Sequence, residues 1–311
     1  MSETNKLEQE ELGFKAGTLW EKVTTRTQHA LKCGALQSIP TEYEFVEQER
    51  FRFLTRILTQ LQRRDEAIQE QHRKERELGQ QLNPFLPYDE DLFVRNLSPT
   101  HLCLLNKYNV VEHHLLMITR AFEEQETWLS VQDFEAMWLC LQEIEGLAFF
   151  NGGTDAGASQ RHKHLQLVPF PLVPDGSSLW IETILEWADF DGIIGTIPQF
   201  PFTHAIARFE PLGSASPQQA AQETFQLYQS LLKAVGLSVE GERQTGAYNL
   251  LATREGMMVV PRSRESYESI SVNSLGFAGA LLVRTQEQLE LLKEIGPIGL
   301  LEAVARSPSK S

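Results

Sequence analysis

The sequence predicts an α+β fold in which an antiparallel sheet packs against helices. Apolar segments of strand length are joined by short connections, and helical segments lie between them without the regular alternation of a doubly wound fold. The 311 residues can bury a large core in one domain or in two lobes. Because Pro169, Pro171 and Pro174 punctuate the chain, we expect an N-terminal lobe over residues 1–175 and a C-terminal α+β lobe over residues 195–311.

Two of the expected helices have clear start signals. Ser130 can cap a helix with Asp133 at the third position, and an apolar stripe continues to Gly146. Ser216 is followed by a proline at the first helical position of a second helix. In chain order, helices are expected over residues 19–31, 130–146, 179–190, 216–234 and 285–295.

The expected strands are arranged around short connections. Residues 109–113 suit a turn between two antiparallel apolar strands, and residues 254–256 suit the turn of a later hairpin. Residues 51–63 fit helical and strand spacing alike, so their conformation stays open. Strands are expected over residues 102–108, 114–119, 147–150, 162–168, 202–209, 248–253 and 257–262.

The charge balance favours small ligands over nucleic acid. A net charge of −14 argues against a nucleic-acid surface, because phosphate backbones require clustered Lys and Arg. A small phosphorylated ligand would need a local positive site. The charged run over residues 62–82 is typical of a solvated helix or loop; the alternative is that Arg63, Arg64 or Lys74 covers a bound phosphate.

Other features indicate a cytoplasmic protein. No apolar run approaches the length of a membrane span, and residues 1–6 lack the apolar region of a signal peptide. The three cysteines are widely spaced, without the pairing of a metal or redox motif. Nothing in the sequence indicates a protein partner.

The stretch from Asn151 to Pro169 carries the candidate chemistry. A glycine-rich loop precedes a short alternating segment, and in a strand successive side chains point to opposite faces. His162, His164 and Gln166 would then share one face, with Lys163 and its apolar neighbours on the other. A zinc site and a purely structural strand are alternatives, but no cysteine pair or nearby carboxylate set completes zinc coordination.

A nucleophilic histidine fits the motif better. A neutral imidazole can attack phosphorus and form a covalent intermediate, provided that a partner fixes its tautomer and donors bind the phosphoryl oxygens. We expect His164 to be the nucleophile, Gln166 to donate its amide to a phosphoryl oxygen, and His162 or a backbone carbonyl to orient the ring. Backbone and hydroxyl donors of the nest type are expected from Gly157, Ala158, Ser159 and Gln160.

These motifs and their flanks resemble a known family. His162-Lys-His164-Leu-Gln166 looks like the histidine-triad superfamily, in the branch with Gln in place of the third histidine. The flanks resemble the ATP adenylyltransferase family, also called diadenosine tetraphosphate phosphorylases, over roughly residues 18–305. The flanking motifs are Leu105 to Val111, His114 to Arg120, Tyr248 to Leu251, Val259 to Arg264 and Asn273 to Gly279.

The resemblance implies a reaction and a set of residues. Diadenosine tetraphosphate and phosphate would give ADP and ATP reversibly, through an adenylyl group on His164, with His114 as the distant histidine of the triad. The implied substrate-binding positions are Asn106, Lys107, Asn151, Gly157 to Gln160, Gln166, Ser271, Val272, Asn273 and Arg284. The family has Lys at position 284 and Met at Ala280, and its early Lys has no clear counterpart here.

Other functions remain open at this stage. A hydrolase of the same superfamily, a hexose-1-phosphate uridylyltransferase-like enzyme and a non-catalytic nucleotide sensor would all use a similar pocket. The expected partners are small nucleotides: diadenosine tetraphosphate, ATP, ADP and phosphate. No covalent cofactor is expected, while Mg²⁺ or another divalent cation is plausible with a polyphosphate substrate, although no dedicated ligand set is visible.

Overall fold

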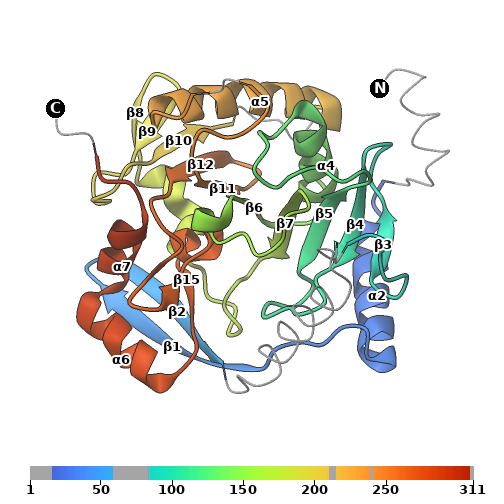
Figure 1. Ribbon diagram of the computed structural model, residues 1–311, viewed down its shortest axis with the longest axis horizontal. Helices are drawn as coiled ribbons and strands as arrows, with labels where there is room; N and C mark the ends of the chain where they lie inside the picture. The colour runs from blue at the N-terminus through green and yellow to red at the C-terminus, as the bar shows by residue number, and fades with distance from the viewer. Residues whose placement is uncertain (1–15, 59–82, 84, 210–214, 239–240, 309–311) are drawn as a thin grey trace, which may run out of the picture.

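A large antiparallel sheet forms the centre of the computed structural model, which describes residues 16–58, 83, 85–209, 215–238 and 241–308 (Figure 1). Its ten strands all pair antiparallel with their neighbours. This architecture confirms the predicted α+β class. In spatial order the strands are β3 (Phe93–Asn96), β4 (His101–Leu105), β5 (Leu115–Thr119), β7 (His164–Pro169), β6 (Gly146–Gly152), β11 (Tyr248–Ala252), β12 (Gly256–Pro261), β10 (Ala205–Arg208), β9 (Ile194–Thr196) and β8 (Asp189–Asp191).

Two smaller sheets lie beside it. β1 (Thr41–Gln48) pairs antiparallel with β2 (Phe51–Leu58), and β15 (Ala280–Val283) adds to β2 in parallel. Strands from the two ends of the chain therefore lie side by side, as the blue and orange-red arrows of Figure 1 show. β13 (Ser266–Tyr267) and β14 (Ile270–Ser271) form a short hairpin.

Residues 51–58, left open between helix and strand, are therefore a strand. They bury Phe51, Phe53 and Leu54, which include side chains on both faces of β2. That two-sided burial explains why their apolar pattern shows no clean period. The charged run over residues 62–82, with Arg63, Arg64 and Lys74, lies outside the described residues.

The helices begin largely where the capping signals place them. Ser130 and Asp133 form both hydrogen bonds of a capping box, and so do Ser216 and Gln219. None of the described helices has the length and apolarity needed to cross a bilayer. The helices are α2 (Leu19–Cys33), α4 (Val131–Leu141), α5 (Pro217–Ala234), α6 (Gln286–Ile295), α7 (Pro297–Val304) and the 3₁₀ segments η1 (Thr154–Ala156), η2 (Trp180–Glu186) and η4 (Ser274–Ala278).

The helix predicted over residues 179–190 is wrong. The structure has the 3₁₀ segment η2 with a break at Thr183, whose φ of −124° and ψ of 16° are not helical, and strand β8 follows. The β-branched residues Ile181, Thr183 and Ile184 favour a regular helix only weakly. Ile181 and Ile184 are instead buried against the sheet from two tight turns.

The sheet separates two apolar layers. On one face it packs against α4 and α5, which also pack against each other, as Figure 1 shows at the top. On the other face, Phe149 and Leu251 belong to a cluster that includes β2, η2 and α7. A smaller cluster around Phe85, Leu116 and Ile118 covers the β4–β5 end of that second face. His164 and Gln166 lie between these two clusters, because β7 pairs with β5 on one side and with β6 on the other.

The sheet is continuous through the predicted lobe boundary. β6 from the first half of the chain pairs with β11 from the second half, with Asn151 opposite Asn249.

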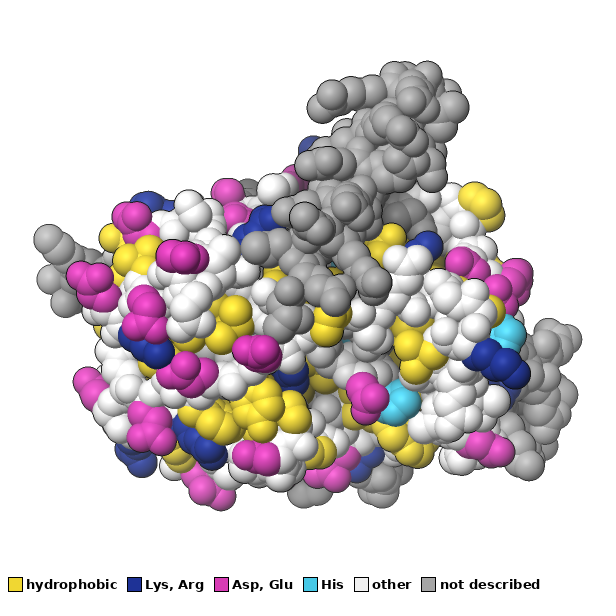
Figure 2. Space-filling view, turned by 90° about the horizontal axis from the view of Figure 1, so that it is seen from below, with side chains coloured by type: hydrophobic (Ala, Val, Ile, Leu, Met, Phe, Trp, Pro, Cys, Tyr) yellow, Lys and Arg dark blue, Asp and Glu magenta, His cyan; other side chains and the backbone are white. Residues whose placement is uncertain are grey.

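At the surface, acidic side chains are spread over the face seen from below in Figure 2, as expected for a net charge of −14. Because the overall charge repels a polyphosphate, donors inside the site must bind it.

Candidate active site

Strand β7 presents His164 and Gln166 as the alternation predicts, whereas His162 precedes the strand and forms an isolated bridge with Glu124. Gln166 pairs with Leu116 and His164 pairs with Ile118, so these two polar side chains share a face with that small apolar cluster. The side chains of Leu165 and Leu167 join the layer of α4 and α5 on the opposite face. His164 is 5% exposed and Gln166 is 9% exposed.

The ring of His164 is fixed in one tautomer. Its Nδ1 lies 2.8 Å from the carbonyl oxygen of His162, which can only accept, so Nδ1 carries the proton. Nε2 then has a free lone pair, and it has no hydrogen-bond partner among the described residues. Burial lowers the pKa of His164 to about 4, so the imidazole is neutral at physiological pH. The ring of Phe85 packs edge-on at a centroid distance of 5.1 Å.

His162 orients the ring of His164 through its backbone carbonyl, while its own ring is held elsewhere. The His162 Nε2–H donates to the carbonyl of Thr119 at 2.8 Å, and Nδ1 accepts from the amide of Asn83 at 2.9 Å. Of the two expected orienting groups, the carbonyl is therefore the one in contact with His164. Burial lowers the pKa of His162 as well.

His114 and Gln166 form the next part of the site. The Nε2–H of His114 donates to Oε1 of Gln166 at 2.9 Å, and its Nδ1 lies 3.3 Å from the amide nitrogen of Asn106. Burial lowers the pKa of His114 to about 4. Because Oε1 of Gln166 is occupied, its Nε2 is oriented as a donor and has no partner among the described residues. Contacts thus run from Asn106 through His114 to Gln166. Lys107, next to Asn106 in the sequence, is half-buried.

Asn151 connects the site to the second half of the chain. Its side-chain oxygen accepts from the amide of Asn249 at 2.9 Å and from both the backbone N–H and hydroxyl of Ser274, at 2.9 and 2.8 Å. The guanidinium of Arg262 donates to Asn249 at 2.6 Å and to the carbonyl of Val272 at 2.9 Å. Burial lowers the pKa of Arg262 to about 10, which leaves it charged. Asn151 keeps its own amide N–H₂ without a partner among the described residues.

The glycine loop packs against the Ser271–Asn273 segment. Gly157 has a φ of +86°, and a Cβ on it would lie 2.9 Å from the carbonyl oxygen of Val272 and 3.0 Å from Asn273. Only glycine satisfies both the backbone conformation and this close approach. The predicted substrate-binding segments 157–160 and 271–273 are therefore neighbours.

The predicted nest is smaller than expected. The N–H groups of Gly157 and Ala158 donate to the carbonyls of Thr154 and Gly153 within the loop, because the loop closes on itself through η1. The N–H groups of Ser159 and Gln160 have no hydrogen-bond partner among the described residues. Only these two amides remain available for a ligand.

Two family models match the sequence and identify the family of the chain. The model described as the Ap4A phosphorylase N-terminal domain matches residues 9–187, more than half of the chain. The chain belongs to the Ap4A phosphorylase family. A second model, the ATP adenylyltransferase C-terminal domain, matches residues 198–307. The family predicted from the motifs is confirmed.

Individual relatives agree with this family. Diadenosine 5′,5′′′-P1,P4-tetraphosphate phosphorylase 2 of Saccharomyces cerevisiae is 29% identical over 246 residues, which cover 68% of this chain and 72% of that protein. Protein APA1 of the same yeast is 26% identical over 218 residues, which cover 61% of this chain and 64% of that protein. The crystal structure of yeast Ap4A phosphorylase Apa2 matches with a TM-score of 0.73 at 23% identity, covering 94% of this chain and 96% of that chain. This likeness confirms the fold.

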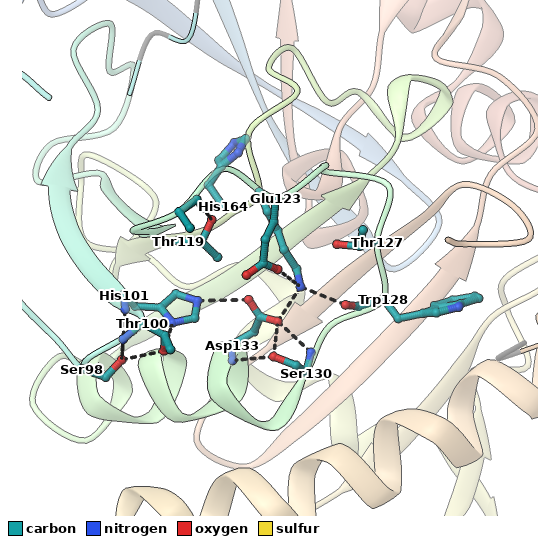
Figure 3. A network of polar contacts seen from close by, with 12 residues as sticks. Ser98, Thr100, His101, Thr119, Glu123, Thr127, Trp128, Ser130, Asp133 and His164 are labelled. Carbon is teal, nitrogen blue, oxygen red and sulfur yellow. Dashed lines mark hydrogen bonds and ion pairs between the residues drawn. The ribbon is translucent and has the colours of Figure 1, made fainter. Parts of the chain in front are cut away.

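A buried ionic network lies behind the family motif (Figure 3). Lys163, 2% exposed, places its ammonium 2.7 Å from Asp133 of α4, and Asp133 also bonds His101 at 3.1 Å and the cap residue Ser130. Burial alone would raise the pKa of Asp133, but the hydrogen bond from His101 and the charge of Lys163 bring it below its usual range. Figure 3 shows the ring of His164 directed away from Asp133 and His101. The network thus anchors the strand without entering the site.

Arg284 lies outside this constellation. It directly follows β15, in the three-stranded sheet, where it is exposed and its backbone N–H donates to Gln288 at 2.7 Å. Among the described residues, the one cluster with metal-ligand geometry is His29, Cys33 and Asp91, which is on α2 and before β3 and includes no predicted site residue.

Several residues that contact the predicted site residues were not themselves predicted from the sequence. Gln125 contacts both His164 and Asn151, and Phe85 covers His164. These two stand in loops without a motif, so no periodicity could reveal them. Asn249 and Ser274 lie within segments quoted for the family resemblance, which was the available signal for their importance.

Proposed function

We propose that this chain is an ATP adenylyltransferase that cleaves diadenosine tetraphosphate with phosphate to give ADP and ATP, reversibly. The observation that carries the proposal is the hydrogen bond from Nδ1–H of His164 to the carbonyl of His162, which leaves the lone pair of Nε2 free for attack. The amide N–H₂ groups of Gln166 and Asn151, unpartnered among the described residues, would supply donors for the phosphate. Family membership supports it. The relative Apa2 is a yeast Ap4A phosphorylase with crystal structures in complex with AMP and with Ap4A.

The chemistry would proceed in two displacements. In the first, Nε2 of His164 attacks an α-phosphorus of diadenosine tetraphosphate, an N–P bond forms, and the P–O bond to the departing ATP breaks. In the second, an oxygen of inorganic phosphate attacks the same phosphorus, ADP is released and the imidazole is restored. The carbonyl of His162 holds the Nδ1 proton and stabilises the positive charge that develops on the ring.

The remaining predicted residues would bind the nucleotide. Gln166, whose amide is oriented by His114, and the backbone amides of Ser159 and Gln160 would donate to phosphoryl oxygens. Lys107 is proposed as a phosphate contact, and Arg284 as a substrate contact outside the constellation around His164. Asn106 and Asn151 would help to place the reacting phosphate, and the Ser271–Asn273 segment would form the wall opposite Gly157.

The described site does not resemble a magnesium site. Its donors are imidazoles and amides, whereas Mg²⁺ prefers carboxylate and phosphate oxygens. If a divalent cation takes part, we propose that it is held by the substrate's phosphates. No step above depends on it.

The acceptor assay tests the reaction. Purified protein is incubated with diadenosine tetraphosphate, with and without phosphate, and the products are separated. ADP plus ATP formed only with phosphate is the expected result. AMP plus ATP would indicate a hydrolase, no product would indicate a nucleotide sensor, and turnover of UDP-glucose with galactose-1-phosphate would indicate a uridylyltransferase.

The covalent step has its own test. A quench during turnover should leave one adenylyl group on the peptide that contains His164, and His164→Ala should abolish both the adduct and turnover. His29→Ala, which removes an exposed histidine of α2, is the matched control and should retain activity. An adduct on another residue, or an active His164→Ala protein, would contradict the assignment.

A further inference from the structure

The central sheet forks at the nucleophile. β6 and β7 pair from Gly146 with Pro169 up to Phe149 with Gln166, and pairing then stops. Both strands continue, because Asn151 still pairs with Asn249 on its far side and His164 still pairs with Ile118. Had the register continued, Asn151 would face His164, and in a closed ladder the two would be joined by backbone hydrogen bonds.

The segment Glu123–Gln125 enters this fork. It runs antiparallel to the residues before β7: the Lys163 N–H donates to the carbonyl of Glu123 at 2.8 Å, and the Gln125 N–H donates to the carbonyl of Arg161 at 2.6 Å. Glu124 and His162 form the isolated bridge between these two contacts. A third stretch of chain therefore borders β7 where its pairing with β6 has ended.

The side chain of Gln125 closes the gap that remains. Its Oε1 accepts from the backbone N–H of His164 at 2.9 Å, while its Nε2 donates to the carbonyl of Asn151 at 2.9 Å and to that of His164 at 3.3 Å. The orientation of the amide is fixed. A flip would turn its N–H₂ towards the N–H of His164, and its oxygen towards the carbonyl oxygens of Asn151 and His164. Because Gln125 is 2% exposed, water cannot readily replace these hydrogen bonds.

We propose that Gln125 is the positioning residue for adenylyl transfer, because its amide takes the place of a peptide group between the separated strands. The fork gives the glycine loop room to leave the sheet beside His164. The amide keeps the backbone of His164 at a fixed distance from Asn151 although the strands have parted. This inference rests on the proposed role of His164, since it concerns how that residue is aimed.

The chemistry of the amide suggests a graded set of variants. Gln125→Leu fills the volume but leaves the His164 N–H and the Asn151 carbonyl unpaired. Gln125→Glu retains the acceptor, but its ionised form cannot donate to Asn151. When protonated, the same carboxyl both accepts and donates, and burial favours this neutral form. A positioning role therefore predicts that Gln125→Glu recovers activity as the pH is lowered, whereas Gln125→Leu does not.

Gln244→Leu provides the matched control. The Gln244 amide donates to the carbonyls of Gln125 and Thr127, at 3.3 and 3.0 Å, so its loss loosens the same segment without removing a contact to His164. Two measurements compare the proteins: the single-turnover rate constant for adenylyl transfer from diadenosine tetraphosphate, and hydrogen exchange at the His164 amide in substrate-free protein.

The expected outcome separates chemistry from stability. Gln125→Leu should slow adenylyl transfer by about 100-fold, the loss typical of a misplaced reacting group, with little change in substrate affinity. It should also expose the His164 amide to exchange, while Gln244→Leu keeps both values near those of the unmodified protein. A folded Gln125→Leu protein with an unchanged rate, or with a protected His164 amide, would overturn the inference.

The two proposals fail in different ways. If the unmodified protein acquires no adenylyl group on His164, the proposed function falls, and hydrogen exchange still decides whether Gln125 holds the strand. If adenylyl transfer is confirmed but Gln125→Glu shows no recovery at lower pH relative to the unmodified protein, the peptide-like role of the amide is wrong.

Discussion

Two histidines of this chain are held in the same way, yet only one is suited to attack phosphorus. The Nδ1–H of His164 donates to the carbonyl of His162, and that of His204 donates to the carbonyl of Phe202, two residues back in each case, at 2.8 and 2.9 Å. The difference is at Nε2. In His204 it accepts the N–H of Ile197 at 2.7 Å, whereas in His164 it has no partner among the described residues.

The buried histidines also make stability depend on pH. His114 and His164 each have a pKa lowered from 6.5 to about 4 by burial, so the unfolded chain binds protons between these values that the native protein does not. Stability is therefore highest above pH 6.5 and falls as the pH drops towards 4, by about 2 kcal/mol per histidine at pH 5.

Urea unfolding at pH 7.5 and pH 5 measures this loss. His164→Asn should remove about 2 kcal/mol of the difference between the two pH values, because the substituted side chain does not titrate in this range. If the variant and the unmodified protein lose the same unfolding free energy between pH 7.5 and pH 5, His164 is not kept neutral by folding.

Among the secondary-structure elements, the sequence predicted those features that depend on neighbouring residues, such as helix caps and strand alternation. The caps at Ser130 and Ser216 begin α4 and α5 as expected, and alternation placed His164 and Gln166 on one face. The fork between β6 and β7 was not predictable. It is bridged by a loop residue, Gln125, that contacts strand residues 26 and 39 positions away. Long-range pairing of this kind leaves no period in the sequence.

The contact between Asp133 of α4 and Lys163, which directly precedes β7, yields a prediction about stability. Lys163→Met leaves the carboxylate of Asp133 buried without its ammonium partner, and should cost about 3–5 kcal/mol. Adding Asp133→Asn should recover part of this loss, since the stranded charge is removed while a capping side chain remains. Denaturant unfolding at pH 7 measures both effects.

Lys293→Met is the matched control for this pair. Lys293 also bonds two carboxylates, those of Glu44 and Glu290, but its side chain is 33% exposed, so water can replace its partners. The substitution should change stability little. A Lys163→Met protein as stable as this control would show that the buried network does not anchor β7.

The halves matched by the two family models share one folded structure. The central sheet passes from β6 to β11, and β2 pairs with β15. Side chains join the same halves: the indole of Trp138 donates to Thr224 of α5 at 2.8 Å, and Ser274 donates to Asn151 at 2.8 Å. Separating them would expose two long strand edges and the interface between α4 and α5.

We therefore expect the halves to unfold together, and the chain offers a direct way to observe it. All five tryptophans lie in residues 1–187, whereas α5, α6 and α7 lie in the second half. Tryptophan fluorescence thus reports on the first half, and far-ultraviolet circular dichroism has a large contribution from the second. In a denaturant titration the two signals should give the same midpoint, as in a two-state transition. A fluorescence midpoint distinct from the circular dichroism midpoint would mean that the sheet divides at the β6–β11 boundary and that the halves are independent domains.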